Sequence, residues 1–212
     1  MALYTGKGDG GTTKTFGCDQ RISKSSEVAE ALGSLDEINS FLGLIKIKAG
    51  ELKRDANNSS NKEGGNILIL GKGFNEIIEG VQQNLFIIQA EVAGSDMTIS
   101  ESKLRECEEY VDEAERLLPP IKTFFVSGGT ELAVLCDISR TIVRRAERRV
   151  VAIVDTQRVT LSQEASSENH SSASSVGPWT LAYLNRLSSL FYVMARLANH
   201  FMGISEGAPS YK

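Results

Sequence analysis

Apolar residues recur three and four positions apart along five stretches of this chain, which is the spacing of one helical face. The stretches cover about residues 28–49, 75–93, 101–118, 130–154 and 179–204. Few segments alternate with a period of two, and no strand–helix repeat is visible. Amphipathic helices bury their apolar faces against one another in a bundle. The pattern therefore predicts an all-α fold, a five-helix up-and-down bundle.

The same spacing predicts the residues of the core. Pro119 and Pro120 end the third stretch, and Gly128 and Gly129 precede the fourth. The expected buried faces are Leu32, Leu35, Ile38, Leu42 and Ile45; Ile78, Val81, Leu85, Ile88 and Val92; Leu104, Cys107, Val111, Ala114 and Leu118; Leu132, Leu135, Ile142, Ala146 and Val150; and Leu184, Leu187, Phe191, Met194, Ala198 and Phe201.

Residues 1–212 are expected to form a single helical-bundle domain with three segments outside the helices. Residues 1–25 are rich in Gly, Thr, Ser and Lys and should form an ordered loop or a flexible arm. Residues 51–66 are polar, and residues 157–178 are Ser-rich and nearly free of large apolar groups. Such compositions bury too little surface to offset the entropy of ordering. We expect both to be mobile loops.

The formal net charge is −4, which argues against a nucleic-acid partner and confines any anion site to a local cluster of cations. Cys18, Cys107 and Cys136 are odd in number and widely spaced, so they predict neither a disulfide framework nor a zinc site. No apolar run approaches the roughly 20 residues that span a bilayer. Because Tyr4 leads directly into a glycine-rich loop, we expect no signal peptide. The apolar runs and the cysteine pattern lead us to expect no membrane partner and a cytoplasmic location with reduced thiols.

The glycine-rich loop TGKGDGGTTK at residues 5–14 is the first candidate anion site. Glycines let successive backbone N–H groups converge on one anion. The threonines add hydroxyl donors, Lys7 and Lys14 add positive charge, and Asp9 is suited either to hold a magnesium ion or to pin the loop. The loop lacks the GxxxxGK[ST] pattern of a P-loop. Its composition alone also fits a disordered segment.

Five arginines within residues 140–149 give a stronger signal. Arg140, Arg144 and Arg148 share one helical face, and Arg145 and Arg149 form a neighbouring row. The nearby carboxylates neutralise only part of this charge, whereas a polyphosphate would neutralise the rest through bidentate guanidinium contacts. A solvated face or interhelical ion pairs would also account for the row.

Other polar groups interrupt apolar helical faces. Asp36 lies beside Leu35, and a half-buried carboxylate needs a partner, for which Arg140 is the obvious candidate. Asn185 and Arg186 lie among leucines, where each is suited either to a ligand-binding site or to a hydrogen bond within the bundle. Phe124 would ordinarily be a core residue.

Together these pieces resemble the ATP:cob(I)alamin (corrinoid) adenosyltransferase family of the propanediol-utilisation type. The matching segments are YTGKGDGGTT (4–13), ALGSLDEINSFLG (31–43), SGG (127–129), SRTIVRRAERRV (139–150) and YLNRLSSLFYVMARLAN (183–199). They span both ends and the middle of the chain, in the family's order. The combination of RRAER with a downstream YLNRLS is specific.

The resemblance implies a homotrimer of such bundles with active sites between subunits. It implies transfer of the 5′-deoxyadenosyl group of ATP, with Mg²⁺, to the cobalt of reduced cobalamin. Asp36 would pair with Arg140 across the subunit interface, Arg144 would act in catalysis, and Phe124 would lie near the lower face of the corrin. The implied ATP-binding residues are Thr5, Gly6, Lys7, Gly8, Thr13, Lys14, Lys24, Arg144, Arg145, Glu147, Arg148 and Asn185.

The chemistry implied by the resemblance requires little from the protein's own acids and bases. Reduced cobalt is a strong nucleophile, so the absence of a credible catalytic role for His170 or His200 is expected. The protein must orient carbon 5′ and neutralise the leaving triphosphate. We expect no metal ligands from the protein itself, with the magnesium carried by ATP. A cobalamin reductase or a cobalamin-dependent mutase would be a suitable partner.

The chain departs from the family pattern at three places. Lys7 comes one position later than the family's loop lysine, Ser189 replaces a carboxylate after the LNRLS motif, and residues 157–178 lengthen a usually short connection.

Two other classes of function stay open at this point. A non-catalytic helical bundle would use its arginine row to bind polyanions or a partner, with strong salt dependence. A kinase on a helical scaffold would release ADP instead of triphosphate. A ferritin-like di-iron bundle is disfavoured because the chain contains no Glu-x-x-His pair.

Overall fold

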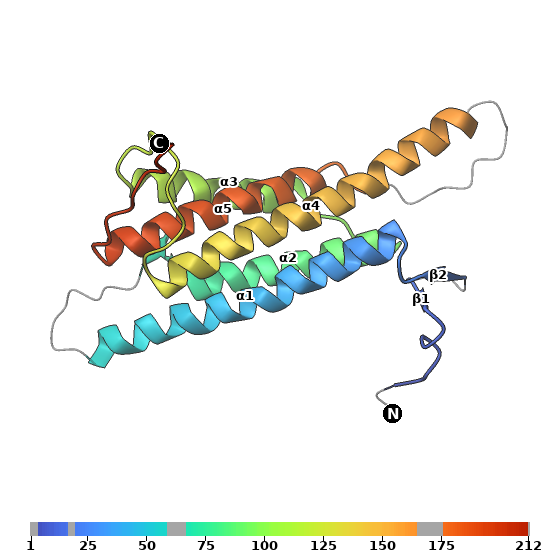
Figure 1. The fold of residues 1–212 in the computed structure, drawn as a ribbon, viewed down its shortest axis with the longest axis horizontal. Helices are drawn as coiled ribbons and strands as arrows, with labels where there is room; N and C mark the ends of the chain where they lie inside the picture. Colours follow the sequence, from blue (N-terminus) through green and yellow to red (C-terminus); the bar gives the residue numbers. More distant parts are fainter. Residues whose placement is uncertain (1–3, 17–19, 59–66, 165–175, 212) are drawn as a thin grey trace.

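The computed structural model describes residues 4–16, 20–58, 67–164 and 176–211, and helices dominate it (Figure 1). The all-α prediction is confirmed. The helices are α1 (Glu27–Asn58), α2 (Phe74–Val92), α3 (Glu101–Arg116), α4 (Glu131–Glu164) and α5 (Thr180–Phe201). Consecutive helices run in alternate directions along the long axis of the molecule.

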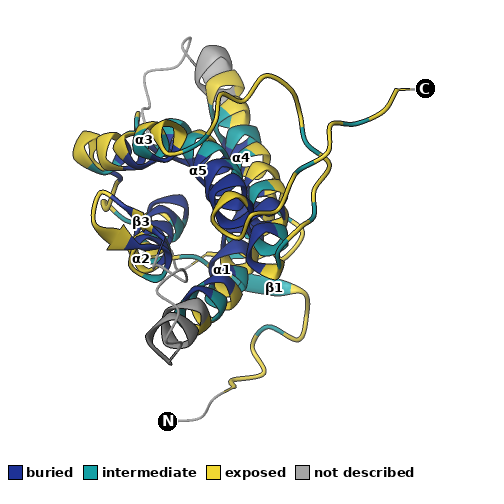
Figure 2. Ribbon diagram, turned by 90° about the vertical axis from the view of Figure 1, so that its left-hand side faces the viewer, coloured by how far each residue is buried: buried dark blue, intermediate teal, exposed yellow. Residues whose placement is uncertain are grey.

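Helix α5 lies at the centre of the bundle. It packs against α4 and α3, while α1 packs against α4 and α2. Every residue from Val193 to Asn199 is buried, so α5 has no continuous solvent face along this part of its length (Figure 2). Even so, no helix of the described ranges is long and apolar enough to cross a membrane.

Most of the predicted core residues are buried. The members from α2 are all buried, as are the four from Leu35 to Ile45 in α1. Phe201 is the clear error: it is 47% exposed, because it is the last residue of α5 and lies past the packed part of the bundle. Leu32, Val111 and Leu135 are only half-buried.

Helices α1 and α4 are longer than the sequence pattern predicts. Residues 51–58 and 157–164 are helical, so the loop predictions are wrong for these residues. Both segments lack Gly and Pro, and both contain the good helix formers Glu, Leu and Arg. The rest of the two predicted loops lies largely outside the described residues.

Two short hairpins flank α1. Strands β1 (Thr12–Lys14) and β2 (Arg21–Ser23) pair antiparallel with Thr13 opposite Ile22, and β3 (Leu68–Ile69) pairs with β4 (Lys72–Gly73). The second hairpin turns through Leu70 and Gly71, whose φ angles of 51° and 78° are both left-handed. Two successive left-handed residues are typical of a type I′ turn. Strands this short leave no periodic signal, and the sequence did not predict them.

Candidate functional site

A cavity of about 750 Å³ lies between α4, α5 and the segment 121–127 that follows α3. Its lining combines aromatic and aliphatic side chains with charged ones. Its lining residues are Val111, Glu115, Ile121, Lys122, Thr123, Phe124, Phe125, Ser127, Asp137, Arg140, Arg144, Ser188, Ser189, Tyr192 and Val193. A cavity with an apolar wall and few charged groups suits a large organic ligand with anionic substituents or an anionic neighbour.

Phe124 forms the most exposed part of the apolar wall. Its side chain is 75% exposed, so it is not the core residue that its type suggests. A single exposed phenylalanine on a surface needs no explanation, but one at the rim of a large cavity is available to a ligand. Ser189, which replaces the family's carboxylate, also lines this cavity.

The first row of arginines faces this cavity and the solvent beside it. Arg140 Nε lies 3.7 Å from Asp137 Oδ1, and Arg140 and Arg144 both line the cavity. Arg148 donates a hydrogen bond of 3.0 Å to the carbonyl oxygen of Arg144. Among the described residues, neither Arg144 nor Arg148 has a carboxylate partner, so their charges are available to an anion.

The second row is neutralised within the chain. Arg145 forms an ion pair with Glu37, and Arg149 lies 3.6 Å from Glu30. Both carboxylates belong to α1. Interhelical ion pairing, the simpler reading of the arginine row, is therefore correct for these two residues.

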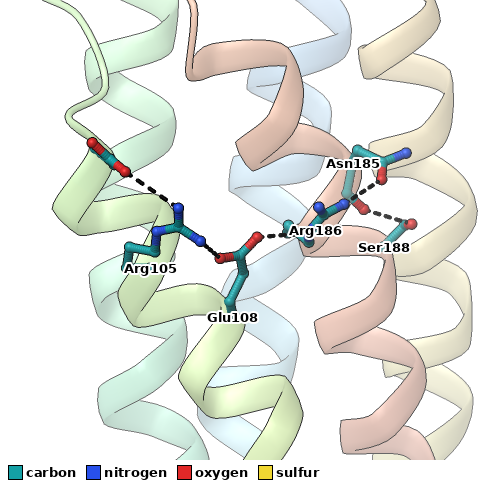
Figure 3. Close-up of polar contacts among 6 residues, drawn as sticks. Arg105, Glu108, Asn185, Arg186 and Ser188 are labelled. Carbon is teal, nitrogen blue, oxygen red and sulfur yellow. Dashed lines mark hydrogen bonds and ion pairs between the residues drawn. The ribbon is translucent and has the colours of Figure 1, made fainter.

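A chain of polar contacts fixes the predicted ATP-binding residue Asn185 (Figure 3). Its Nδ2 donates to Glu147 at 3.0 Å, while its Oδ1 accepts from Arg186 at 3.1 Å. Arg186 Nε donates in turn to Glu108 of α3 at 3.0 Å. Glu108 also accepts from Arg105, at 2.9 Å. The contacts bring the predicted pair Asn185 and Glu147 together and give Asn185 one amide orientation.

The charge of Glu108 follows from these contacts. The Arg186 guanidinium, with a smaller contribution from Arg105 and against the effect of burial, holds the pKa of the Glu108 carboxyl below its usual range. Glu108 is therefore ionised at neutral pH and holds Arg186 beside Asn185.

The N-terminal loop is organised by Arg21 of β2. Its guanidinium donates to the carbonyl oxygen of Lys7 at 2.6 Å, and to Thr12 through both the side chain, at 2.8 Å, and the carbonyl, at 2.7 Å. Gly6 and Gly11 have φ angles of 67° and 76°, which only glycine adopts without strain. These contacts hold the glycine-rich loop against the β1–β2 hairpin.

Lys24, another predicted ATP-binding residue, lies against the same loop. Its Nζ is 3.2 Å from the position that a Cβ on Gly8 would occupy. Thr5 accepts a weak hydrogen bond from the backbone N–H of Lys7 at 3.4 Å, and Thr13 pairs with Ile22 in the hairpin. Thr5, Gly6, Lys7, Gly8, Thr13, Lys14 and Lys24 therefore belong to one small unit.

This loop unit does not lie over the arginine row of the same chain. It projects beyond the N-terminal end of α1, away from the bundle (Figures 1 and 2). The structure of one chain thus brings the predicted ATP-binding residues together in two separate groups.

Asp36 differs from its expected environment. It is exposed on α1, not half-buried, and the ion pair of Arg140 within the chain is with Asp137. The expected pairing of Asp36 with Arg140 was across a subunit interface, and a single chain does not test it. Within the described residues, no group of three or more His, Cys, Asp or Glu side chains is placed to share a metal ion.

Three residues of the site region were missed by the sequence analysis. Arg21 and Glu108 organise the loop and Asn185, and Arg196 lies buried behind the cavity wall with its guanidinium 2.7 Å from Asp137. Arg196 lies among the buried apolar residues of α5. A charged residue at such a position is the sequence signal that could have revealed it. Nothing in the sequence separates Arg21 or Glu108 from ordinary surface charges.

Known proteins resemble this chain in sequence, and solved structures resemble it in fold. The chain is 31% identical over 207 residues to the corrinoid adenosyltransferase PduO of Citrobacter freundii, and 32% identical over 213 residues to a corrinoid adenosyltransferase of Bacillus subtilis. It spans about half the length of the Citrobacter protein, 50%, but 91% of the Bacillus protein.

A solved structure of a variant PduO-type ATP:corrinoid adenosyltransferase from Lactobacillus reuteri, complexed with cobalamin and ATP, superposes with a TM-score of 0.73 at 26% identity, covering 99% of this chain and 97% of that one. The sequence profile of the cobalamin adenosyltransferase family matches residues 3–198, which include the glycine-rich loop, the arginine row and Asn185. On the strength of that match, this chain belongs to the cobalamin adenosyltransferase family.

Proposed function

We propose that this chain transfers the 5′-deoxyadenosyl group of ATP to the cobalt of cob(I)alamin and releases triphosphate. The observation that carries the proposal is the 750 Å³ cavity, which Phe124 and Phe125 line together with Arg140 and Arg144. The aromatic side chains suit the flat face of a corrin, and the guanidinium groups suit the phosphates of ATP. Family membership and the ligands of the Lactobacillus reuteri structure support the same reaction.

The protein's task in this reaction is to position and to neutralise charge. Cobalt(I) attacks carbon 5′ of the ribose, and the bond from that carbon to the triphosphate oxygen breaks. No proton has to be removed from the nucleophile, so no general base is needed. Arg144 and Arg148, which lack carboxylate partners in the described structure, would neutralise the leaving triphosphate together with Mg²⁺.

A homotrimer with active sites between subunits would unite the two groups of ATP-binding residues. The loop unit of residues 5–14 and Lys24 projects away from its own bundle. Placed against the α4 and α5 faces of a neighbour, it would bring Lys7, Lys14 and Lys24 toward Arg144 and Asn185. The same assembly would give the exposed Asp36 a partner in Arg140.

Phe124 would exclude the lower axial ligand of cobalt. Such exclusion eases the reduction of cob(II)alamin to the nucleophilic cob(I)alamin. Phe124→Ala is therefore expected to lower turnover from cob(II)alamin in the presence of a reductase while leaving ATP affinity unchanged. Full activity of this variant from cob(II)alamin would reject the role.

The reaction would take place in the cytoplasm with a reductase as electron donor and a cobalamin-dependent mutase as acceptor. Cys107 and Cys136 are both free and buried, which suits a reducing compartment. Burial raises the pKa of the Cys107 thiol to about 12, so it is not a nucleophile that competes with cobalt.

The proposal is tested by mixing the protein with MgATP and chemically reduced cob(I)alamin under anaerobic conditions. We expect adenosylcobalamin and triphosphate to form in equal amounts, with Arg144→Ala much slower and Glu109→Ala, an exposed residue of α3, unchanged. Release of ADP would indicate a kinase. Salt-sensitive binding of many polyanions without turnover would indicate a binding module.

A further inference from the structure

Arg196 is a fully buried arginine behind the cavity, with a side chain only 2% exposed. It forms ion pairs with Asp137 at 2.7 Å and with Glu206 at 2.9 Å. Its guanidinium carbon also lies 5.6 Å from the centre of the Phe125 ring and 5.1 Å from that of Tyr192. Its Nε is buried without a hydrogen-bond partner in the described structure, so the charge depends on these two ion pairs and two rings. A buried charge that loses a partner is costly, so these partners must stay in place together.

Three of the groups around Arg196 are also walls of the site. Phe125, Tyr192 and Asp137 line the 750 Å³ cavity. On the other side, Phe125 and Ile121 are shared with a second cavity of about 170 Å³ that Arg196 and Glu206 line. The segment that carries Phe124 and Phe125 is thus a thin partition between two cavities, and Arg196 supports it from behind.

The chain after α5 completes this support. The Val126 N–H donates to the carbonyl oxygen of Gly207 at 2.9 Å, which ties the partition directly to the C-terminal segment. Asn199 Nδ2 lies 2.6 Å from Glu206 Oε1 and 2.9 Å from the carbonyl oxygen of Gly128. Glu206 therefore contacts both side chains, Arg196 and Asn199, that hold the two ends of the partition.

We propose that Glu206, acting through Arg196 and Asn199, is a positioning residue that fixes the Phe124–Phe125 wall and so sets the affinity for the corrinoid. The inference rests on the proposed function for the identity of the ligand. The contacts by which Glu206, Arg196 and Asn199 hold the wall are present in the protein without ligand. The segment after α5 is then part of the corrinoid site without lining the large cavity. Among the described residues, Glu206 contacts Arg196 and Asn199 and none of the predicted ATP-binding residues, so we expect ATP binding to be independent of it.

The test compares Glu206→Ala and Glu206→Gln with Ser205→Ala, an exposed neighbour in the same segment. Hydrogen–deuterium exchange of residues 121–128 is measured without ligands. In Glu206→Ala we expect exchange there to be faster by about tenfold, with α1 and α2 unchanged. Glu206→Gln keeps an acceptor for Arg196 and Asn199 and should fall between Glu206→Ala and the wild type, whereas Ser205→Ala should match the wild type.

Kinetics then separate positioning from a general loss of structure. We expect the KM for the corrinoid to rise by about tenfold in Glu206→Ala while the KM for ATP stays unchanged. If Glu206→Ala does not fold, the same comparison is made with Glu206→Gln.

Unchanged exchange at residues 121–128 would overturn the proposal, and so would equal rises in both KM values. A wild-type protein without turnover would reject the proposed function instead, and the exchange measurement would still decide whether Glu206 holds the wall.

Discussion

Gly129 shows how one backbone conformation holds the start of α4. Its φ is 93°, and a Cβ added there would overlap the Asn199 side-chain amide. That amide accepts the N–H of Thr130 at 2.8 Å and donates to the carbonyl oxygen of Gly128 at 2.9 Å. Glycine is needed here for both its φ and its lack of a side chain.

Gly129→Ala is therefore expected to lower the free energy of unfolding by about 1–3 kcal/mol. Urea unfolding followed by circular dichroism measures the change. Gly128→Ala is the matched control, because nothing lies within 4 Å of a Cβ at that position and its φ is not left-handed. Equal stability of the two variants would contradict this account of Gly129.

At the scale of elements, the β3–β4 hairpin contains a residue in an unfavourable conformation. Leu70 has a φ of 51° and is 50% exposed, so it gains little burial there. A left-handed conformation costs a residue with a Cβ about 1 kcal/mol, and asparagine tolerates it better. Leu70→Asn is expected to raise the midpoint of thermal unfolding. A lower midpoint would mean that the leucine side chain makes a contact that outweighs the strain.

The link between α3 and α5 through Glu108 and Arg186 gives a prediction that depends on pH. The folded protein holds the pKa of Glu108 below the value that it has in the unfolded chain. The ion pair therefore stabilises the fold fully at pH values above the unfolded pKa. This contribution is lost as the pH falls through the lower pKa of the folded state. A double-mutant cycle with Glu108→Gln and Arg186→Gln should show favourable coupling at pH 7. The coupling should weaken in high salt and vanish in acid. A coupling that persists in acid would show that charge is not its source.

At the scale of the whole molecule, the separation of the loop unit from the arginine row predicts complementation between subunits. A Lys14→Ala variant and an Arg144→Ala variant should each be nearly inactive. Random mixed trimers of the two should recover about a quarter of wild-type activity, since three in four such trimers contain one intact site of three. Mixing is done by co-refolding, with each variant refolded alone as control. No recovery would mean that each site lies within one chain.

The sequence determined the number of helices, their buried faces and the family. These depend on local spacing and on motifs whose members are neighbours in the chain, such as SRTIVRRAERRV, whose spacing alone puts arginines on one helical face. Helix ends were predicted less well: α1 and α4 continue into polar segments, because propensity without an apolar face is enough to extend a helix that the bundle has already formed.

Only the tertiary structure decided which charges were free and which were paired. Arg145 and Arg149 form ion pairs with carboxylates on α1, whereas Arg144 and Arg148, each one residue earlier in the chain, have no carboxylate partner in the part of the chain that the structure describes. Arg196 contacts groups from three other parts of the chain, and Phe124 is exposed although its type favours the core. Such partners are distant in sequence, and the packing of whole helices determines which of them meet.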